Sequence, residues 1–574
     1  MFKPLAGNIP PAVSGATALE TRYDPQARVD IALTLPFRDK AGLDDYTTHL
    51  FDPADPLYHH YLTAQEINAR FGPTQADYDA VVAFAKSQGL TVTHTSPNRL
   101  LLDVSAPAAT VETAFGVRLM QFQDKNGRIF HAPDREPSVP AAIAPRLLGI
   151  IGMDNDAVAV PQLAHGKTPA FKPSQLHGMT PDLQHPIDPG DPGGGSGGGS
   201  TPPAPTASGT AVTAYNLNSI PQNGQGQILD LVELIGFNPN DVTAYENAFG
   251  LPHVPIQIIS VDGASNTTIS VSPSISSAEP TLDIELAAAV APGLSLIRVY
   301  EGPSDGSFKS LLDVEYIIAE GQAYQTSCSY AYPENGLSSS QKQSEGNILQ
   351  YLLVNGNSFF AASGDWGPYD NNRRNVTALD PASQYYSCAV GGTTLSTDQY
   401  GNYASETTWD LIDIFNGQNY SVASGGGVSN FWTIGKQSPV IKAGSGASTT
   451  MRNVPDVSLN AYADYAFFYN GGWSSEGGTS AACPIWASFL ALVNSRLVPQ
   501  GVAPLADFTS ALYSIAAGPR YTMDFHDIAD GSNNHLFSGG PGNQAVPGYD
   551  LTTGLGSFNG ANLFADLVAA AGGK

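Results

Sequence analysis

The chain contains few residues of several types, and each shortage excludes a kind of partner or a class of protein. Lysine and arginine make up only 26 of its 574 residues, against 52 aspartates and glutamates, for a formal charge of −26. A surface so poor in cations repels nucleic acid and anionic lipid, so we expect neither nucleic acid nor a membrane as a partner. No continuous apolar run reaches the roughly 18 residues of a membrane span, and the first residues lack the apolar stretch of an ordinary signal peptide.

Cysteine is also scarce. The three residues, Cys328, Cys388 and Cys483, have no CxxC spacing, and their odd number excludes a fully paired framework within one chain. Two alternatives remain open, namely one disulfide bridge or three small buried apolar side chains.

What is abundant fits a globular protein of two or three domains. Apolar residues make up 42% of the chain and charged residues 14%, enough for a core and too little charge for a disordered polyelectrolyte. Carboxylates titrate near about pH 4, so an acid-rich surface loses its self-repulsion in an acidic medium. The composition therefore permits an acidic environment.

The chain divides at a segment rich in glycine, serine and proline. Residues 161–210 have no apolar period and include the run GDPGGGSGGGSTPPAP, which is typical of a linker. We therefore predict an amino-terminal domain over residues 1–160 and a larger domain over residues 211–574.

The two domains have different strand and helix patterns. In the first, strands and helices alternate in a strand–helix–strand order that occurs twice, which favours an α+β ferredoxin-like sandwich. In the second, short apolar strands precede helices, which predicts an α/β fold with a mostly parallel sheet flanked by helices. The expected strands are residues 28–35, 91–94 and 100–105 in the first domain and 228–234, 294–300 and 358–362 in the second. The expected helices are residues 63–71, 75–88, 106–115, 241–249 and 339–353.

A candidate nucleophile follows two glycines. Ser480 stands in the sequence GGTSAACP, before an apolar helical stretch, so it would open a helix whose free N–H groups favour a nearby anion. The alternative is an ordinary serine at the start of a core helix.

A candidate base lies in the segment SAEPTLDIELAAAVAPG. Glu279 and Asp283 are four residues apart near a predicted helix start, so they project from one side and would titrate as a pair. Such a pair can exchange a proton in acid, where a histidine base would stay charged. The alternative is an acidic first helical turn that only complements the helix dipole.

Together these motifs resemble the sedolisins, the serine-carboxyl peptidases, and among them the kumamolisin-like branch. The G-T-S-x-x-x-P motif is similar to that of the subtilisin clan, but no H-G-T-H-type histidine accompanies it, and E-x-x-x-D stands in its place. The resemblance implies a subtilisin-like sheet, with Ser480 as nucleophile and Glu279 as its base. Asp283 would orient Glu279 and share its proton.

The resemblance extends to further site residues. Asp365, in SGDWG after a predicted buried strand, would be a protonated donor to the oxyanion, and Glu233 would extend the proton network behind Asp283. Tyr330 stands where this branch usually has tryptophan. The substrate would be bound by Gly478 and by the segment that holds Ser329, Ala331 and Tyr332.

A turn-rich region near the carboxyl terminus resembles the calcium loop of the family. Carboxylates and turn carbonyls make the all-oxygen cage that suits Ca²⁺. The resemblance implies one Ca²⁺ ion. Its ligands would be the carboxylates of Asp527 and Asp550 and the backbone oxygens of Ile528, Val546 and Gly548.

The amino-terminal domain resembles the activation domain of sedolisin precursors, with matching stretches such as YHHYLT and RFGPT. It would be an inhibitor of its own peptidase domain, with a processing site in the linker. Acid would protonate interface carboxylates and loosen it.

We therefore expect a secreted, monomeric, acid-acting endopeptidase that cleaves proteins and peptides and processes its own precursor. The alternatives are a tripeptidyl exopeptidase, whose substrate site would be closed at one end, and a non-enzymatic binding protein that kept the fold.

Overall fold

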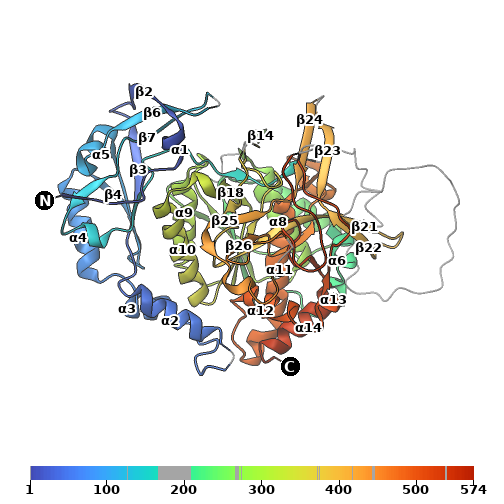
Figure 1. Ribbon diagram of the computed structural model, residues 1–574. Coiled ribbons are helices and arrows are strands. Elements are labelled where there is room, and N and C mark those ends of the chain that lie inside the picture. The colour runs from blue at the N-terminus through green and yellow to red at the C-terminus, as the bar shows by residue number, and fades with distance from the viewer. Residues whose placement is uncertain are drawn as a thin grey trace.

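The structure is a computed structural model of the full chain. It describes all residues except 1, 53, 126, 166–207, 266–270, 273–274, 372, 374, 416–417, 443–445, 537–539 and 574. An amino-terminal part, blue in Figure 1, lies beside the helices α9 (Phe308–Ile318) and α10 (Ser339–Val354) of a larger carboxyl-terminal part. Most of the predicted linker, including any processing site within residues 166–207, lies outside the described residues.

The amino-terminal part contains the predicted ferredoxin-like sandwich. Its antiparallel sheet has the order β4-β5-β3-β9, and the sequence joins these strands through helices in the β-α-β-β-α-β pattern. Local signals set the helix starts, because Thr63 and Glu66 form a capping box at α3 and Thr74 caps α4. The elements are β3 (Arg28–Thr34), α2 (Lys40–Leu50), α3 (Ala64–Arg70), α4 (Gln75–Ser87), β4 (Thr91–Thr95), β5 (Leu101–Pro107), α5 (Ala108–Phe115) and β9 (Gly149–Ile151).

The carboxyl-terminal part is built on one large sheet, as the sequence predicted. Seven strands run parallel in the order β13-β16-β12-β17-β19-β21-β27, and β22 joins β21 antiparallel. The strands are β12 (Ile228–Glu233), β13 (Ile256–Ser260), β16 (Leu296–Glu301), β17 (Gln325–Cys328), β19 (Ser358–Ala362), β21 (Ser387–Thr397), β22 (Tyr403–Thr408) and β27 (Val457–Asn460).

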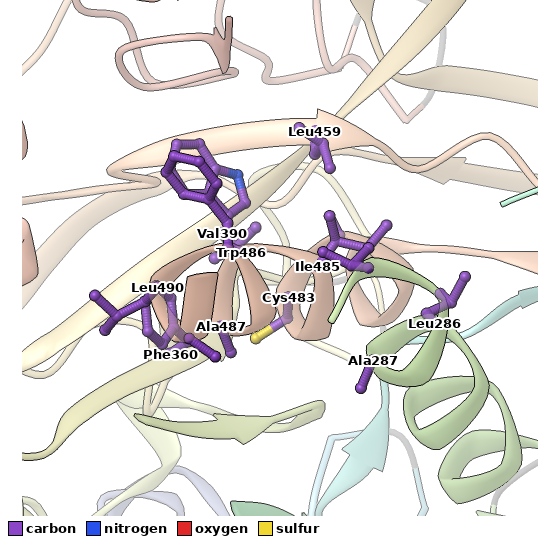
Figure 2. Packing of buried hydrophobic residues seen from close by; sticks show 14 of the residues in the cluster. Leu286, Ala287, Phe360, Val390, Leu459, Cys483, Ile485, Trp486, Ala487 and Leu490 are labelled. Carbon is purple, nitrogen blue, oxygen red and sulfur yellow. The ribbon is translucent and has the colours of Figure 1, made fainter. Parts of the chain in front are cut away.

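Helices cover both faces of this sheet, which is why its strands are apolar throughout. On β19, Phe359 and Ala361 pack with α9 and α10, whereas Phe360 and Ala362 pack with α8 (Ala278–Val290) and α11 (Thr479–Leu497). Figure 2 shows the second face, where side chains of α11 such as Ile485 and Trp486 lie beside α8 and beside strand residues of the sheet. Further elements on that side are α7 (Pro239–Phe249), α12 (Phe508–Ala516) and α14 (Gly560–Ala570).

The core bears on two sequence expectations. All three cysteines are free and buried, so the reading as small apolar side chains is the right one. By length and composition, Thr479–Gln500 could cross a membrane, although its continuous apolar run is shorter. However, 83% of its apolar window is buried, because this helix forms the centre of the core.

The two parts contact each other through several polar groups. Thr34 and Ser344 share a hydrogen bond of 2.8 Å between their hydroxyl oxygens. At the other end of the interface, the N–H of Ala506 donates to the Tyr61 hydroxyl at 3.1 Å, and Asn355 donates to the carbonyl of Leu62 at 2.8 Å. The amino-terminal part is therefore docked on the carboxyl-terminal part through α9, α10 and the loop before α12.

Candidate active site

The predicted site residues meet at one edge of the large sheet. Glu233 ends β12, Ser329 follows β17, and Asp365 lies three residues beyond β19. Because these strands are parallel neighbours, their carboxyl ends lie together, where α/β sheets commonly hold their sites. The helices α8 and α11 pack against each other and bring Glu279, Asp283 and Ser480 to the same place.

Ser480 lies in the first turn of α11, and Gly478 is the residue before this helix. Gly478 has a φ of +95°, and a Cβ there would collide with the carbonyl oxygen of Gln162 and with Oδ2 of Asp365. The site therefore requires glycine at this position. The N–H of Ser480 donates to the Gln162 carbonyl at 3.0 Å, and its hydroxyl faces the Ser329 carbonyl at 3.5 Å.

Glu279 and Asp283 lie one turn apart on α8, and both are fully buried. Burial raises the pKa of Glu279 well above its ordinary value. The charge of Asp283 acts in the same direction, and the nearby Ser480 hydroxyl opposes it. Burial also raises the pKa of Asp283, which accepts a hydrogen bond from the Ser329 hydroxyl at 2.7 Å. Among the described residues neither oxygen of Glu279 has a hydrogen-bond partner, so this carboxyl is poised to take a proton.

Behind this pair the carboxyl network continues along the sheet. Glu233 accepts a hydrogen bond from the Tyr330 hydroxyl at 3.1 Å. Burial raises the pKa of Glu233, as do the charges of Asp283 and Glu279. Glu301 stands opposite Glu233 in the parallel register of β12 and β16, and burial raises its pKa to about 7. Among the described residues no cation pairs with these four buried carboxyls, so we expect them to titrate together and share protons.

Asp365 is held from two sides. Its Oδ1 accepts hydrogen bonds of 2.9 Å from both the N–H and the hydroxyl of Thr479. Its own N–H donates to the side-chain oxygen of Gln162 at 3.0 Å. The carboxyl group of Asp365 therefore lies beside Gly478 and the Gln162 carbonyl, next to the N–H of Ser480.

A segment of this chain, residues 158–165, runs through the site, and we call it the docked segment. Its first half contains β10 (Val160–Pro161), which pairs antiparallel with β18 (Tyr330–Pro333). Its second half contains β11 (Ala164–His165), which pairs antiparallel with β29 (Gly472–Gly477). Between these halves, the N–H of Gln162 donates to the carbonyl of Ser329 at 3.0 Å. The docked segment thus crosses Ser480 as an extended strand.

The predicted substrate-binding residues differ in their positions. Ser329 and Ala331 contact or pair with the docked segment, and Gly478 lies against it. Tyr332 instead pairs with Asp380 of β20 (Leu379–Asp380), and its hydroxyl donates to the Ser307 carbonyl at 2.9 Å. Since β18 is a strand, Ala331 and Tyr332 face opposite sides of it.

The predicted calcium residues form a compact loop. The N–H of Gly548 donates to Asp527 Oδ2 at 3.0 Å, and the N–H of Val546 donates to Asp550 Oδ2 at 3.1 Å. Both carboxylates thus flank one turn, and Ile528 is buried beside them. Two carboxylates and a turn rich in backbone oxygens fit a hard cation such as Ca²⁺, which takes six to eight oxygen ligands.

A second acidic group was not singled out from the sequence. Oxygens of Asp103, Asp262 and Asp313 all lie within 4.8 Å of one another at the boundary between the two parts. The ammonium group of Lys309 lies among them, 3.4 Å from Asp103 and 2.9 Å from Asp262, and it also pairs with Asp313. A protein cation therefore already occupies the position that a metal would take.

Sequence reasoning also missed Gln162 and Glu301. Neither belongs to a motif, and Gln162 lies two residues beyond the composition change at which the linker was predicted to begin. The signal was the short apolar stretch VPQLA, which the glycine-rich segment does not resemble.

Comparisons with known proteins relate the chain to one group of peptidases. Residues 16–155 match the family model "Pro-kumamolisin, activation domain". The chain is 28% identical to sedolisin of Pseudomonas sp. (strain 101), covering 96% of this chain and 89% of the relative. It is also 28% identical to kumamolisin of Bacillus sp. (strain MN-32), covering 94% and 92% respectively. The solved structure of Pseudomonas sedolisin, a serine-carboxyl proteinase, is similar with a TM-score of 0.55 and 27% identity, covering 64% of this chain and 99% of that one.

Proposed function

Because this chain belongs to the sedolisin family of serine-carboxyl peptidases and carries a pro-kumamolisin activation domain, we propose that it is an acid-acting endopeptidase made as a self-processing precursor. The observation that carries the proposal is a peptide carbonyl, that of Gln162, held at 3.0 Å by the N–H of Ser480 beside Asp365. A buried carboxyl pair lies next to the serine hydroxyl.

The reaction begins at the serine. Ser480 Oγ attacks the carbonyl carbon of the substrate, and Glu279 takes the hydroxyl proton. The new oxyanion is stabilised by the N–H of Ser480 and by a protonated Asp365. Glu279 then gives its proton to the leaving amine, and water hydrolyses the acyl-enzyme by the reverse proton transfers.

Acid favours this arrangement for a physical reason. Burial raises the pKa values of Glu279, Asp283 and Glu233, and the charges of neighbouring carboxylates add to this for Glu279 and Glu233, so the network keeps protons that exposed carboxylates would lose. A protonated carboxyl can donate a hydrogen bond, as Asp365 must do to an oxyanion. Above the pH at which the network ionises, like charges would accumulate without a cation, and activity should fall.

The docked segment favours an endopeptidase over a tripeptidyl peptidase. Counting back from Gln162, the fourth residue, Ala159, donates its N–H to the Gly306 carbonyl at 2.7 Å. The fifth, Val158, pairs with Ser307. A site that releases tripeptides would be closed beyond the third residue, whereas here the chain continues along the protein.

Calcium would have a structural role in this proposal. Asp527 and Asp550 would supply carboxylate oxygens, and Ile528, Val546 and Gly548 would supply carbonyls. The ion would hold this loop together and lies outside the proton network. We expect a chelator to lower the thermal midpoint of the protein and added Ca²⁺ to restore it, while added Mg²⁺ restores less.

We also propose that the protein is secreted and monomeric, and that its amino-terminal part inhibits the peptidase before processing. The docked segment supports inhibition, since a substrate has to replace it to reach Ser480. The intact set of Ser480, Glu279, Asp283 and Asp365 weighs against a non-enzymatic binding protein, which would have no need of all four.

One experiment tests the proposal. The purified precursor is brought to about pH 4, near carboxylate pKa values, and its mass and its cleavage of casein are followed beside Ser480→Ala. We expect the wild type to shorten and to digest casein, while Ser480→Ala stays intact. If the wild type also stays intact and inactive across acidic pH, the peptidase proposal is wrong.

A further inference from the structure

We infer that the bond between Gln162 and Leu163 is the first that this protein cleaves, and that its own Ser480 cleaves it within the same molecule. This inference rests on the proposed function and adds the bond, the direction of the chain and a side-chain preference. It places the processing point at the start of the predicted linker, before the glycine-rich run.

The backbone of Gln162 is bound as a substrate would be. Its carbonyl accepts from the N–H of Ser480 at 3.0 Å, and its N–H donates to the Ser329 carbonyl at 3.0 Å. Both polar groups of one peptide residue are therefore fixed around the nucleophile. A carbonyl at the start of a helix, beside Asp365, lies where the negative charge of a tetrahedral intermediate would develop.

The strands on both sides fix the register. Val160 pairs with Ala331 before the bond, and Ala164 pairs with Gly477 after it. Leu163 is buried and packs into the large apolar cluster of the carboxyl-terminal part. A slip of one residue would turn every side chain of the docked segment to the opposite side, so this register is strongly specified.

The side chain of Gln162 is recognised as well. Its oxygen accepts the N–H of Asp365 at 3.0 Å, and its amide nitrogen donates to the carbonyl of Val160 at 2.6 Å. Gln162 is fully buried, so both amide groups are satisfied without water. A primary amide of this length is therefore the chemical class that the pocket before the scissile bond accepts in this chain.

The chemistry balances with water as the only co-reactant. Ser480 Oγ bonds to the carbonyl carbon of Gln162, and its proton passes to Glu279. The carbon–nitrogen bond to Leu163 breaks, and the same proton passes to the nitrogen of Leu163. Water then hydrolyses the ester, leaving a carboxylate on Gln162, which ends the fragment 1–162, and a free amine on Leu163, which begins the fragment 163–574.

The test follows the first cut in the full-length precursor. After acidification, the earliest new amino terminus is identified by sequencing and intact mass, at several protein concentrations. We expect it to be Leu163, with a first-order rate that does not change over a tenfold dilution. A first cut elsewhere, or a rate proportional to concentration, would overturn the inference.

Two variants of the docked segment and one control variant sharpen the test. Leu163→Pro should block this cut, because the bond becomes a tertiary amide whose ring fills the space beside the leaving nitrogen. Gln162→Ala should slow it about tenfold, since it loses the hydrogen bond to Asp365. The exposed Gln26→Ala is the matched control and should be processed at the wild-type rate. Equal rates for Gln162→Ala and Gln26→Ala would exclude recognition of the amide.

A peptide assay distinguishes a failure of this inference from a failure of the proposed function. The peptide AVAVPQLAH, residues 157–165, is incubated with the processed enzyme beside casein. Cleavage of casein without cleavage between Gln and Leu in either peptide or precursor would overturn the inference and leave the proposed function standing. No cleavage of casein, peptide or precursor would remove the proposed function and the inference with it.

Discussion

Two acidic clusters in this protein, one fully buried and one partly buried, offset the repulsion between their carboxylates in different ways. The proposed catalytic network of Glu233, Glu279 and Asp283 contains no cation among the described residues. The interface cluster of Asp103, Asp262 and Asp313 surrounds the ammonium group of Lys309. Buried carboxylates need either a proton or a cation to offset their desolvation. In the proposed mechanism the first cluster uses protons, which it could exchange with a substrate, whereas the second has the fixed charge of Lys309.

The difference also bears on the proposed release of the amino-terminal part in acid. Burial raises the pKa of Asp103 to about 6, although the charge of Lys309 opposes this. A carboxyl whose pKa is higher in the docked state binds its proton more tightly there, so acid strengthens docking at this residue. The expectation that acid loosens the interface by protonating its carboxylates therefore does not hold for Asp103, and the proposed release in acid would need another group.

The largest effect should come from removing the proton acceptor of the catalytic network. Glu279→Gln keeps the shape but cannot take the serine proton, so kcat should fall by about 10²–10⁴-fold. The thermal midpoint should stay the same or rise, because one buried ionisable group is gone. The control is Glu285→Gln on the same helix, whose side chain still accepts the N–H of Phe468. Kinetics on casein and thermal unfolding are measured, and wild-type kcat in Glu279→Gln would refute this role.

The second-largest effect should come from removing the cation of the interface cluster, because its carboxyls would then need protons to offset their burial. Lys309→Met leaves Asp103 and Asp313 buried without their cation, which should cost about 3–5 kcal/mol at pH 7. The carboxyl pKa values would rise in the folded state, so the loss should shrink as the pH falls toward 5. Urea unfolding is followed at both pH values in a Ser480→Ala background.

The control for this variant is Lys40→Met, which removes an exposed pair with Asp44 of the same i, i+4 spacing. We expect a change of less than about 1 kcal/mol there at either pH. Equal destabilisation of Lys309→Met at pH 7 and pH 5 would contradict the comparison between the two clusters.

A smaller effect concerns the group that can release the amino-terminal part. His59 is buried between Tyr58 and Tyr61, and burial lowers its pKa to about 4. A free histidine has a pKa near about 6.5, so the stability from this neutral group is present above that pH. It is lost as the pH falls from about 6.5 to 4, by at most about 3 kcal/mol.

His59→Asn tests this release. Asparagine does not titrate, and it tolerates the left-handed φ of 56° at this position. The pH at which half of the precursor is processed should therefore fall, by up to about 1 unit. His60→Asn is the control, and an unchanged midpoint in His59→Asn would exclude His59 as the acid trigger.

The smallest effect should come from removing a negative charge near the proposed catalytic network. The charge of Glu476 adds to the raised pKa of Glu279, behind burial and the charges of Asp283 and Asp365 in importance. Glu476→Gln removes this like charge, so the pKa of Glu279 should fall and the acid limb of the kcat profile should move down by about 0.3 unit. A shift toward higher pH would contradict this reading of the network.

The sequence predicted the fold well because its local signals agreed with the tertiary result. Residues 358–362 were expected as a strand and form β19, and Ser480 was expected at a helix start and lies in the first turn of α11. Boundaries moved by one or two residues elsewhere, as for β5, which begins at Leu101 and runs to Pro107. Helices bury both faces of the sheet, which explains why strands such as β19 are buried on both sides and largely apolar.

The sequence by itself determined which residues could carry the chemistry, because short-range spacing sets their local positions. Ser480 follows two glycines at a helix start, and Glu279 and Asp283 are one helical turn apart. Only the tertiary structure decided that Gln162 lies on Ser480, that Glu301 stands opposite Glu233, and that Lys309 occupies the second acidic cluster. These are contacts between segments far apart in the chain. They depend on strand register and helix packing, which no short motif encodes.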